Sequence, residues 1–219
     1  MPLKPSILPD LIRAAAETID AHAEEVTALD QTLGDGDHVT NLQRGLKALS
    51  AKSDELAQMS DWSNAFQKIG MTVMSSVGGA SGSLYGTLFI ALAKAYRGDR
   101  PVAPTSLTLE TFAGTFDEAV AAVQKRGKTD VGQKTMVDTL VPVADALTAA
   151  AKGGEPSTGA AEKVKQAAVA GMESTRDLLA TKGRASYLGE RTRGIVDAGA
   201  RTSQLMICAI ADALTGQKT

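Results

Sequence analysis

Three aspartates gather in one short, glycine-containing stretch of this sequence. Asp35 and Asp37 are separated by a single glycine, and Asp30 precedes them by five residues. Carboxylates that lie so close repel one another, and each is costly if it is partly buried. A hard divalent cation removes that cost, because Mg²⁺ takes oxygen ligands and keeps open positions for phosphate or water. Gly34 and Gly36 would let the loop turn tightly enough to aim the three carboxylates at one point.

The same loop has a more ordinary interpretation and one competing metal interpretation. An isolated Asp-Gly-Asp is typical of an Asx-type turn, with Thr40 or Asn41 capping the helix that follows. The third carboxylate and the His-x-Thr-Asn sequence after the pair favour a metal site instead. A calcium-binding EF-hand is excluded, because the fifth position from the first aspartate of the pair is Val39 and the twelfth is Leu46 rather than glutamate.

A second loop is rich in glycine and in hydroxyl side chains. Gly78, Gly79 and Gly82 lie beside serines at a point where a helix is expected to begin. Such a helix start presents free N–H groups and a favourable dipole to an anion. The loop is not a Walker loop, because no Gly-Lys-Ser/Thr follows. Taken alone, it is equally consistent with a helix–helix connection in which glycine allows close packing.

A third segment, residues 182–199, concentrates arginine in a slightly acidic protein. It contains Arg184, Arg191 and Arg193, and the planar, always charged guanidinium suits phosphate. A charge run by itself is more often a solvated loop, but this one also carries Tyr187 and is long for a connection in a compact bundle. Together the three loops could supply a metal site, a phosphate cradle and cationic clamps, which are the parts needed for phosphoryl transfer.

Neither histidine is an obvious nucleophile. His22 falls on an apolar helical stripe and is expected in the core or at its edge, whereas His38 could donate a hydrogen bond to phosphate. A phosphorylated His38 is disfavoured by the three acidic residues around it. The single cysteine, Cys208, excludes an intrachain disulfide framework and a cysteine-based zinc cluster.

The composition excludes several classes of protein. The chain has 219 residues and a formal net charge of −2, so bulk charge does not indicate a nucleic-acid-binding surface. Hydrophobic residues make up 43%, which is enough for a core and excludes wholesale disorder. No apolar run approaches the roughly 20 residues that span a bilayer, and the N-terminus lacks a secretory signal. We therefore expect one cytoplasmic domain over residues 1–219, with no membrane contact and no nucleic-acid partner.

Apolar residues recur at helical spacing almost throughout the chain, whereas strand-like alternation is absent. From Ile12 one stripe runs through Ala15, Ile19, His22 and Val26, in steps of three and four. Breaks rich in glycine and proline divide the pattern into about eight expected helices, over residues 6–29, 40–52, 61–76, 81–97, 107–126, 134–152, 158–182 and 199–215. Short connections make successive helices antiparallel neighbours, so the sequence predicts an all-α, up-and-down bundle.

These loops resemble the L subunit of dihydroxyacetone kinase, which is the nucleotide-binding subunit of that enzyme. The order and spacing of the motifs hold over essentially the whole chain, and the last segment is the most specific. The matching segments are Leu33–His38 with Thr40-Asn41 and Arg44-Gly45, Ser75–Gly82, Arg126–Lys128 with Gly132-x-Lys134-Thr135-Met136, and Lys182–Arg191.

The resemblance implies a closed, up-and-down barrel of eight antiparallel helices that binds ADP or ATP and two Mg²⁺ at one end. By the family pattern, Asp30, Asp35 and Asp37 hold the metal ions. The same pattern assigns nucleotide binding to His38, Val39, Thr40, Asn41, Ala80, Ser81, Gly127, Met136, Arg184, Asp197, Ala198 and Gly199.

The resemblance also implies partners and a reaction. Phosphate would pass from the Mg-bound nucleotide to dihydroxyacetone held on a partner K subunit, and a phosphohistidine carrier of the phosphotransferase system (the M subunit) would rephosphorylate ADP. Two alternatives stay open: an ATP-dependent kinase subunit for another short ketose, such as a tetrose, and a nucleotide-bound regulatory module. Val39 in place of glycine, and Ile195 and Ala198 in place of histidine and proline, depart from the family pattern and leave the donor and the sugar open.

Overall fold

The computed structural model describes residues 3–98 and 106–216; the remainder of the expected domain of residues 1–219, namely 1–2, 99–105 and 217–219, lies outside the described residues. The described part contains α1 (Leu8–Ala21), α2 (Ala23–Leu33), α3 (His38–Ser50), α4 (Ser53–Ala57), α5 (Trp62–Ser76), α6 (Gly79–Arg97), α7 (Leu109–Gly127), α8 (Val137–Lys152), α9 (Ser157–Ser174) and α10 (Ala198–Thr215). Short 3-10 helices lie at Pro5–Ile7 (η1), Thr175–Asp177 (η2) and Arg184–Thr192 (η3). One isolated antiparallel bridge pairs Leu3 with Leu107. The all-α class is therefore confirmed.

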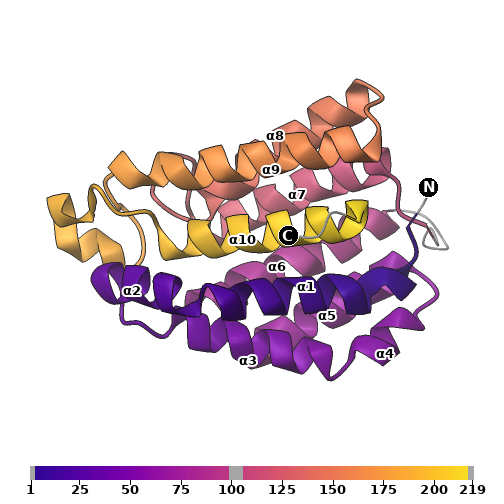
Figure 1. Cartoon of the computed structure of the whole chain (residues 1–219), viewed down its shortest axis with the longest axis horizontal. Helices are drawn as coiled ribbons and strands as arrows, with labels where there is room; N and C mark the ends of the chain where they lie inside the picture. The colour runs from indigo at the N-terminus through magenta and orange to yellow at the C-terminus, as the bar shows by residue number, and fades with distance from the viewer. Residues whose placement is uncertain (1–2, 99–105, 217–219) are drawn as a thin grey trace.

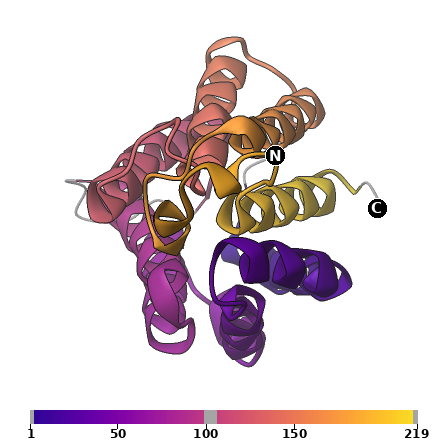
Figure 2. The same cartoon turned by 90° about the vertical axis from the view of Figure 1, so that its left-hand side faces the viewer.

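The long helices form a closed ring. α1, α3, α5, α6, α7, α8, α9 and α10 each pack against the next in chain order, and α10 packs against α1. The end-on view of Figure 2 shows this ring, and Figure 1 shows its helices running along the long axis of the molecule. Because neighbours in the ring are also neighbours in the chain, their directions alternate. The expected up-and-down barrel is the architecture that the structure shows.

Apolar side chains face the interior of this barrel. Trp62, Phe66 and Tyr96 cluster there, with the ring centroid of Phe66 5.2 Å from that of Trp62 and 6.3 Å from that of Tyr96. The indole N–H of Trp62 donates to the carbonyl of Leu3 over 2.9 Å, which satisfies its polar group. An apolar cavity of about 540 Å³ lies inside the ring and is lined by side chains from all eight ring helices.

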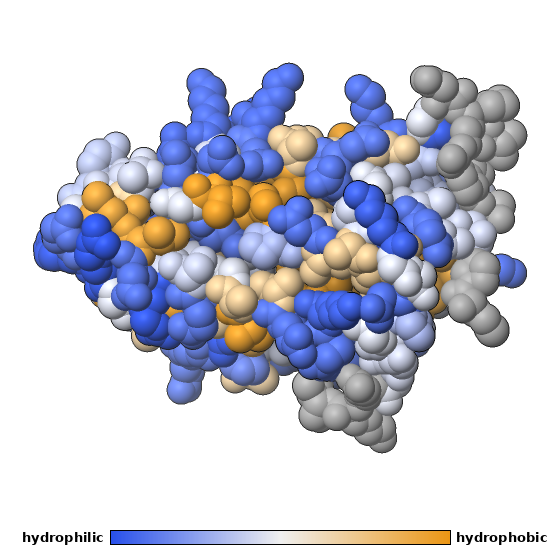
Figure 3. Space-filling view, turned by 90° about the horizontal axis from the view of Figure 1, so that it is seen from above, coloured by the Kyte–Doolittle hydropathy of each residue, from blue (hydrophilic) through white to orange (hydrophobic). Residues whose placement is uncertain are grey.

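The outer surface over α8 and α9 is mixed, with hydrophilic side chains between smaller apolar areas (Figure 3). Val169 on α9 is one exposed apolar residue. This surface follows from the amphipathic pattern, since each helix turns its apolar stripe toward the ring interior. Within residues 3–98 and 106–216, no helix combines the length and the apolar character that a bilayer crossing requires.

The helix predicted over residues 6–29 is divided in two. It is interrupted at His22, whose backbone is not helical (φ −108°, ψ 14°), and it continues as α2. His22 is half-buried at this break, and its Nδ1 lies 2.9 Å from the carbonyl oxygen of Thr18; its expected place at the core edge is confirmed. The short helix α4 was not expected, because five residues are too few to display a helical period.

The prediction of a helix that continues to residue 182 is wrong. α9 ends at Ser174, η2 follows, and Leu178 is already extended (φ −73°, ψ 149°). Thr175 continues the helical spacing of Val164 and Ala168 and is fully buried. Its hydroxyl, however, donates to the carbonyl of Met172 over 2.7 Å and accepts from the backbone N–H of Asp197 over 3.0 Å. Its burial therefore reflects contact with the start of α10 and not a further turn of helix.

Candidate functional site

Four connections meet at one end of the barrel, at the left of Figure 1 and facing the viewer in Figure 2. They are the α2–α3 loop, the α5–α6 loop, the α7–α8 loop and the long segment 175–197 between α9 and α10. The fold explains this meeting, because every second connection of an up-and-down barrel lies at the same end. The three loops that the sequence singled out are therefore brought together, and the α7–α8 loop joins them.

The three predicted metal ligands lie close enough to share an ion. Asp30, in the last turn of α2, and Asp35 and Asp37, in the loop that follows, each offer one carboxylate oxygen, and these oxygens lie within 4.8 Å of one another. Asp30 is half-buried and the other two are exposed. Mg²⁺ takes oxygen ligands, so the donor type fits this ion.

Two glycines and one arginine shape the acidic cluster formed by Asp30, Asp35 and Asp37. A Cβ on Gly34 would lie 2.4 Å from Asp30 Oδ1, so a larger residue at that position would displace the carboxylate. The backbone N–H of His38 donates to Asp30 Oδ2 over 3.1 Å and orients it. Arg184, in η3, forms an ion pair with Asp35, which places its guanidinium beside the cluster.

His38 connects three helices behind the acidic cluster. Its Nδ1 lies 3.0 Å from Ser81 Oγ on α6, and its Nε2 lies 2.9 Å from Thr202 Oγ1 on α10. Burial lowers the pKa of the His38 imidazole, against the opposing charges of Asp30 and Asp37, so the ring is neutral at neutral pH. Both ring nitrogens are engaged in hydrogen bonds, which suits the ring to positioning and leaves neither nitrogen lone pair open to accept a phosphoryl group.

The start of α6 offers backbone N–H groups near His38. No side chain caps its first turn, so these donors are available to an anion. The approach is close: a Cβ on Gly82 would lie 2.0 Å from the carbonyl oxygen of Val77, and a Cβ on Gly78 would lie 2.6 Å from Asn41 Oδ1. The predicted phosphate contacts from the α3 and α6 starts therefore lie side by side.

The α7–α8 loop is held by a buried carboxylate. Asp138 accepts from the backbone N–H of Gly132 over 2.5 Å and from that of Thr135 over 2.8 Å. Met136, just before α8, is buried, and Gly127 is half-buried at the end of α7. The loop is thus a fixed wall of the site, with Met136 and Gly127 at its two ends.

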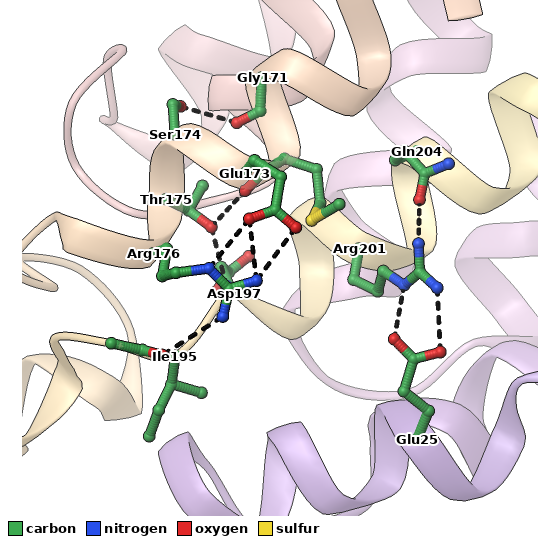
Figure 4. A network of polar contacts seen from close by, with 12 residues as sticks. Glu25, Gly171, Glu173, Ser174, Thr175, Arg176, Ile195, Asp197, Arg201 and Gln204 are labelled. Atoms are coloured by element: carbon green, nitrogen blue, oxygen red, sulfur yellow. Dashed lines mark hydrogen bonds and ion pairs between the residues drawn. The ribbon is translucent and has the colours of Figure 1, made fainter.

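Asp197 caps α10 beside this wall. Its Oδ2 accepts from the N–H of Ala200 over 2.8 Å, and its own backbone N–H donates to Thr175 Oγ1 over 3.0 Å (Figure 4). Burial raises the pKa of the Asp197 carboxyl to about 6, against the lowering effects of the Ala200 N–H and of a nearby lysine. A Cβ on Gly199 would lie 3.6 Å from the Cβ of Met136, so the α10 start and the α7–α8 loop are in contact.

The raised pKa of Asp197 predicts a pH dependence of stability that asparagine should remove. Because the folded-state value of about 6 exceeds the unfolded 3.8, the folded protein binds more protons between these values, and this group's contribution to stability is lost as pH rises through 6. Between pH 5 and pH 7 that loss is about 1 kcal/mol. Asp197→Asn keeps a capping side chain but cannot titrate.

Urea unfolding of both proteins at pH 5, 6 and 7, with chelator present, measures this effect. The unfolding free energy of the wild type relative to Asp197→Asn should be higher at pH 5 than at pH 7 by about that 1 kcal/mol. A difference between the two proteins that is the same at all three pH values would contradict the assignment.

Two of the expected cationic clamps do not reach the acidic cluster. Arg191 and Arg193 are both exposed, and Arg193 pairs with Glu190 over 2.7 Å. Figure 4 shows a similar local pair, in which Arg176 contacts Glu173 at the base of the same segment. Of the three arginines predicted as clamps, it is Arg184 that the structure brings to the site.

Several residues of the site had no assigned role in the sequence. Thr202 lies 164 positions from His38, so no local spacing relates the two. Asp138 and Lys134 are both buried. Lys134 stood in a motif, but nothing in the sequence indicated the hydrogen-bond partners of either residue. The structure also locates two of the departures from the family pattern. Val39 is 3% exposed and lies in the core, and Ala198 is the first residue of α10.

Comparison with known proteins identifies the family of this chain. The DAK2 domain matches residues 32–212. The ADP-binding subunit of PEP-dependent dihydroxyacetone kinase 1 from Listeria innocua is 38% identical over 194 residues, which cover 89% of each chain. The ADP-binding subunit of PTS-dependent dihydroxyacetone kinase from Lactococcus lactis is 40% identical over 188 residues, covering 85% of this chain and 86% of that one.

A solved structure shares the fold. The dihydroxyacetone kinase of C. freundii, in complex with AMP-PNP and Mg²⁺, superimposes with a TM-score of 0.70 at 22% identity. The match covers 97% of this chain but 34% of that one, so this chain spans about a third of the length of that enzyme. At this identity the likeness establishes the helical architecture.

Proposed function

We propose, from the fact that this chain belongs to the DAK2 domain family, that it serves as the nucleotide-binding subunit of a dihydroxyacetone kinase. The observation that carries this proposal is the meeting of the acidic cluster with the uncapped start of α6 at one end of the barrel. Carboxylates alone repel phosphate, and helix starts alone attract it. Their combination suits a nucleoside phosphate whose charge is balanced by a cation.

Asp30, Asp35 and Asp37 would hold Mg²⁺, and the resemblance implies two ions. Bound there, the metal would neutralise charge on the phosphates of the nucleotide. The chain's own residues position the ligand: His38, Val39, Thr40 and Asn41 at the start of α3, and Ala80 and Ser81 at the start of α6, would contact the phosphates. Hydrogen bonds between the His38 ring and the hydroxyls of Ser81 and Thr202 fix the orientation of the ring.

The remaining predicted residues would hold the rest of the nucleotide. Gly127, Met136, Asp197, Ala198 and Gly199 lie in the wall formed by the α7–α8 loop and the α10 start. Arg184 reaches the acidic cluster from the long segment between α9 and α10, and in the complex its guanidinium would turn from Asp35 to a phosphate oxygen. Arginine suits this exchange because its fork binds carboxylate and phosphate alike.

The phosphate donor and acceptor are proposed from the relatives that match over most of their length. Both are named as ADP-binding subunits of a PEP- or PTS-dependent kinase. We infer that ADP stays on this subunit, that a phosphohistidine carrier (the M subunit) rephosphorylates it, and that a separate K subunit presents dihydroxyacetone. Phosphoryl transfer needs little from the protein beyond positioning and charge neutralisation, which is the work that this site is built to do.

Titration calorimetry with MgADP on the nucleotide-free protein tests the proposal. The wild type should bind, and Arg184→Ala should weaken binding on the order of tenfold, because it removes one charge-assisted contact. Arg191→Ala is the matched control, since that arginine lies in the same segment but is exposed and does not reach the cluster. Absence of MgADP binding by the wild type would reject the proposed function, and equal affinity for Arg184→Ala would remove this residue from the site.

A further inference from the structure

Lys134 is a buried lysine at the nucleotide end of the barrel. Its residue is 2% exposed, and its backbone is left-handed, with φ of +60°. The Nζ donates to the carbonyl oxygens of Thr175, of Ile195 (2.5 Å) and of Arg176 (3.3 Å). An ammonium has three N–H donors, so each finds a backbone acceptor. A buried charge is costly unless hydrogen bonds compensate for its lost hydration. The buried ammonium of Lys134 is therefore expected to have a structural or functional role.

The three carbonyls belong to two stretches of the α9–α10 connection that lie side by side. Thr175 and Arg176 lead out of α9, and Ile195 leads back toward α10. Two further hydrogen bonds join the same stretches: the N–H of Gly194 donates to the carbonyl of Arg176 over 2.8 Å, and the N–H of Asp197 donates to Thr175 Oγ1 over 3.0 Å. Lys134 therefore stands at the base of the segment 177–194 and joins its two ends.

The base of segment 177–194 is connected to several elements that line the candidate site. The segment 177–194 holds Arg184, which contacts Asp35. The residues that follow this segment lead into Asp197, the N-cap of α10. Lys134 itself lies two residues before Met136, in the loop fixed by Asp138. One side chain thus connects the α7–α8 loop, the Arg184 segment and the α10 start.

We propose that Lys134 is a positioning residue for the nucleotide: it clasps the base of segment 177–194 to the α7–α8 loop and so sets where Arg184 and Asp197 stand. The inference rests on the proposed function, because its consequence is the affinity for nucleotide. The clasp itself is a property of the free protein and can be measured without any ligand.

The charges around Lys134 agree with this role. Burial lowers the pKa of the ammonium, while the carboxylates of Asp197, Asp177 and Asp138 raise it and Arg176 lowers it. Three carboxylates from three elements therefore surround one cation, and they compensate for part of its lost hydration. An apolar side chain of similar length would leave three carbonyls without their donor.

Lys134→Met tests the clasp by two measurements. In the nucleotide-free protein, amide hydrogen exchange followed by mass spectrometry should show faster exchange in peptides covering 177–197 and unchanged exchange in α5 and α6. The dissociation constant for MgADP should rise about tenfold or more. Lys134→Arg retains the charge and donors and should recover part of both effects.

Two controls separate positioning from a general loss of stability. Lys165→Met removes a lysine that pairs with Asp212 over 2.8 Å between α9 and α10, away from the site, and should leave MgADP affinity unchanged. Leu147→Ala opens space in the apolar interior and should lower the melting temperature without weakening MgADP comparably. If Lys134→Met does not fold, Lys134→Gln, which keeps an N–H donor group but no charge, is measured in its place with the same expected directions.

The outcomes are distinguishable. Unchanged exchange in residues 177–197 of the variant, or unchanged MgADP affinity alongside a wild type that binds, overturns the role of Lys134. A wild type that does not bind MgADP rejects the proposed function, while faster exchange in the variant would still establish the clasp as a structural element.

Discussion

Replacing Asp37 with asparagine is expected to abolish magnesium-dependent ADP binding while leaving the fold intact. The substitution removes one of three carboxylates whose oxygens lie within 4.8 Å of one another, and the neutral amide is a weaker ligand for a hard cation. Asp37 is exposed and makes no capping hydrogen bond to α3. Loss of binding would therefore report on the ligand set and not on the helix.

Asp37→Asn should not lower the melting temperature of the free protein, whereas it should lower that measured in the presence of MgADP. Without metal, three neighbouring carboxylates repel, so Asp37→Asn should leave the melting temperature of the nucleotide-free protein unchanged or slightly raised. In the wild type, MgADP at a hundredfold excess over its dissociation constant should stabilise by about 2.7 kcal/mol. That amounts to a rise of about 5–10 °C for a domain of this size, and the variant should show none of it.

Thermal unfolding with magnesium alone, ADP alone and both together measures these shifts. Asp117→Asn is the control, because Asp117 is exposed on α7 and lies outside the acidic cluster; it should retain the full shift. A wild-type shift that is equal with and without magnesium, or one that survives in Asp37→Asn, would contradict the metal site. Loss of helicity in Asp37→Asn would instead show that the loop has a structural role.

Dihydroxyacetone should remain unphosphorylated when the purified chain is incubated with MgATP alone, and adding the K subunit should start the reaction. The physical reason is positional: transfer needs the acceptor hydroxyl held in line with the terminal phosphate, and we propose that the partner supplies that alignment. The exposed end of the site is accessible for such docking, since Tyr187 beside Arg184 is 88% exposed.

The same assay can identify the donor. With both subunits present, dihydroxyacetone phosphate formation is followed with MgATP, and separately with phosphoenolpyruvate, the carrier proteins and a trace of ADP. The relay predicts turnover in the second mixture that greatly exceeds the ADP supplied, and Asp37→Asn in the complete mixture gives the background. Product formed by the purified chain with MgATP and no second protein would overturn the subunit assignment.

Much of the fold could be predicted because it depends on local pattern. Steps of three and four placed the core-facing side of each long helix, and glycine-rich breaks placed the turns. The errors had two causes, a tertiary contact that imitates a local pattern and a break in the backbone that leaves the pattern unchanged. Thr175 is buried and hydrogen-bonded to the backbone N–H of Asp197, although its spacing continues that of the apolar residues of α9. The break at His22 interrupts a pattern that is helical on both sides.

The acidic cluster was predictable because its members lie within eight residues of one another, and such a short loop leaves little freedom to separate them. The cationic clamps were not. Arg184, Arg191 and Arg193 have the same chemistry and neighbouring positions, yet it is Arg184 that contacts Asp35, whereas Arg191 is exposed and Arg193 pairs with Glu190.

By itself, the sequence determined the helical class, the alternating direction of successive helices, and the chemistry of each loop, since all of these follow from residues close together in the chain. Only the tertiary structure decided which loops share one end and which side chains meet there. His38 finds Thr202 across 164 positions, and Lys134 finds Ile195 across 61. Such meetings depend on how the ring closes and how each helix is rotated about its axis, and no local spacing encodes either.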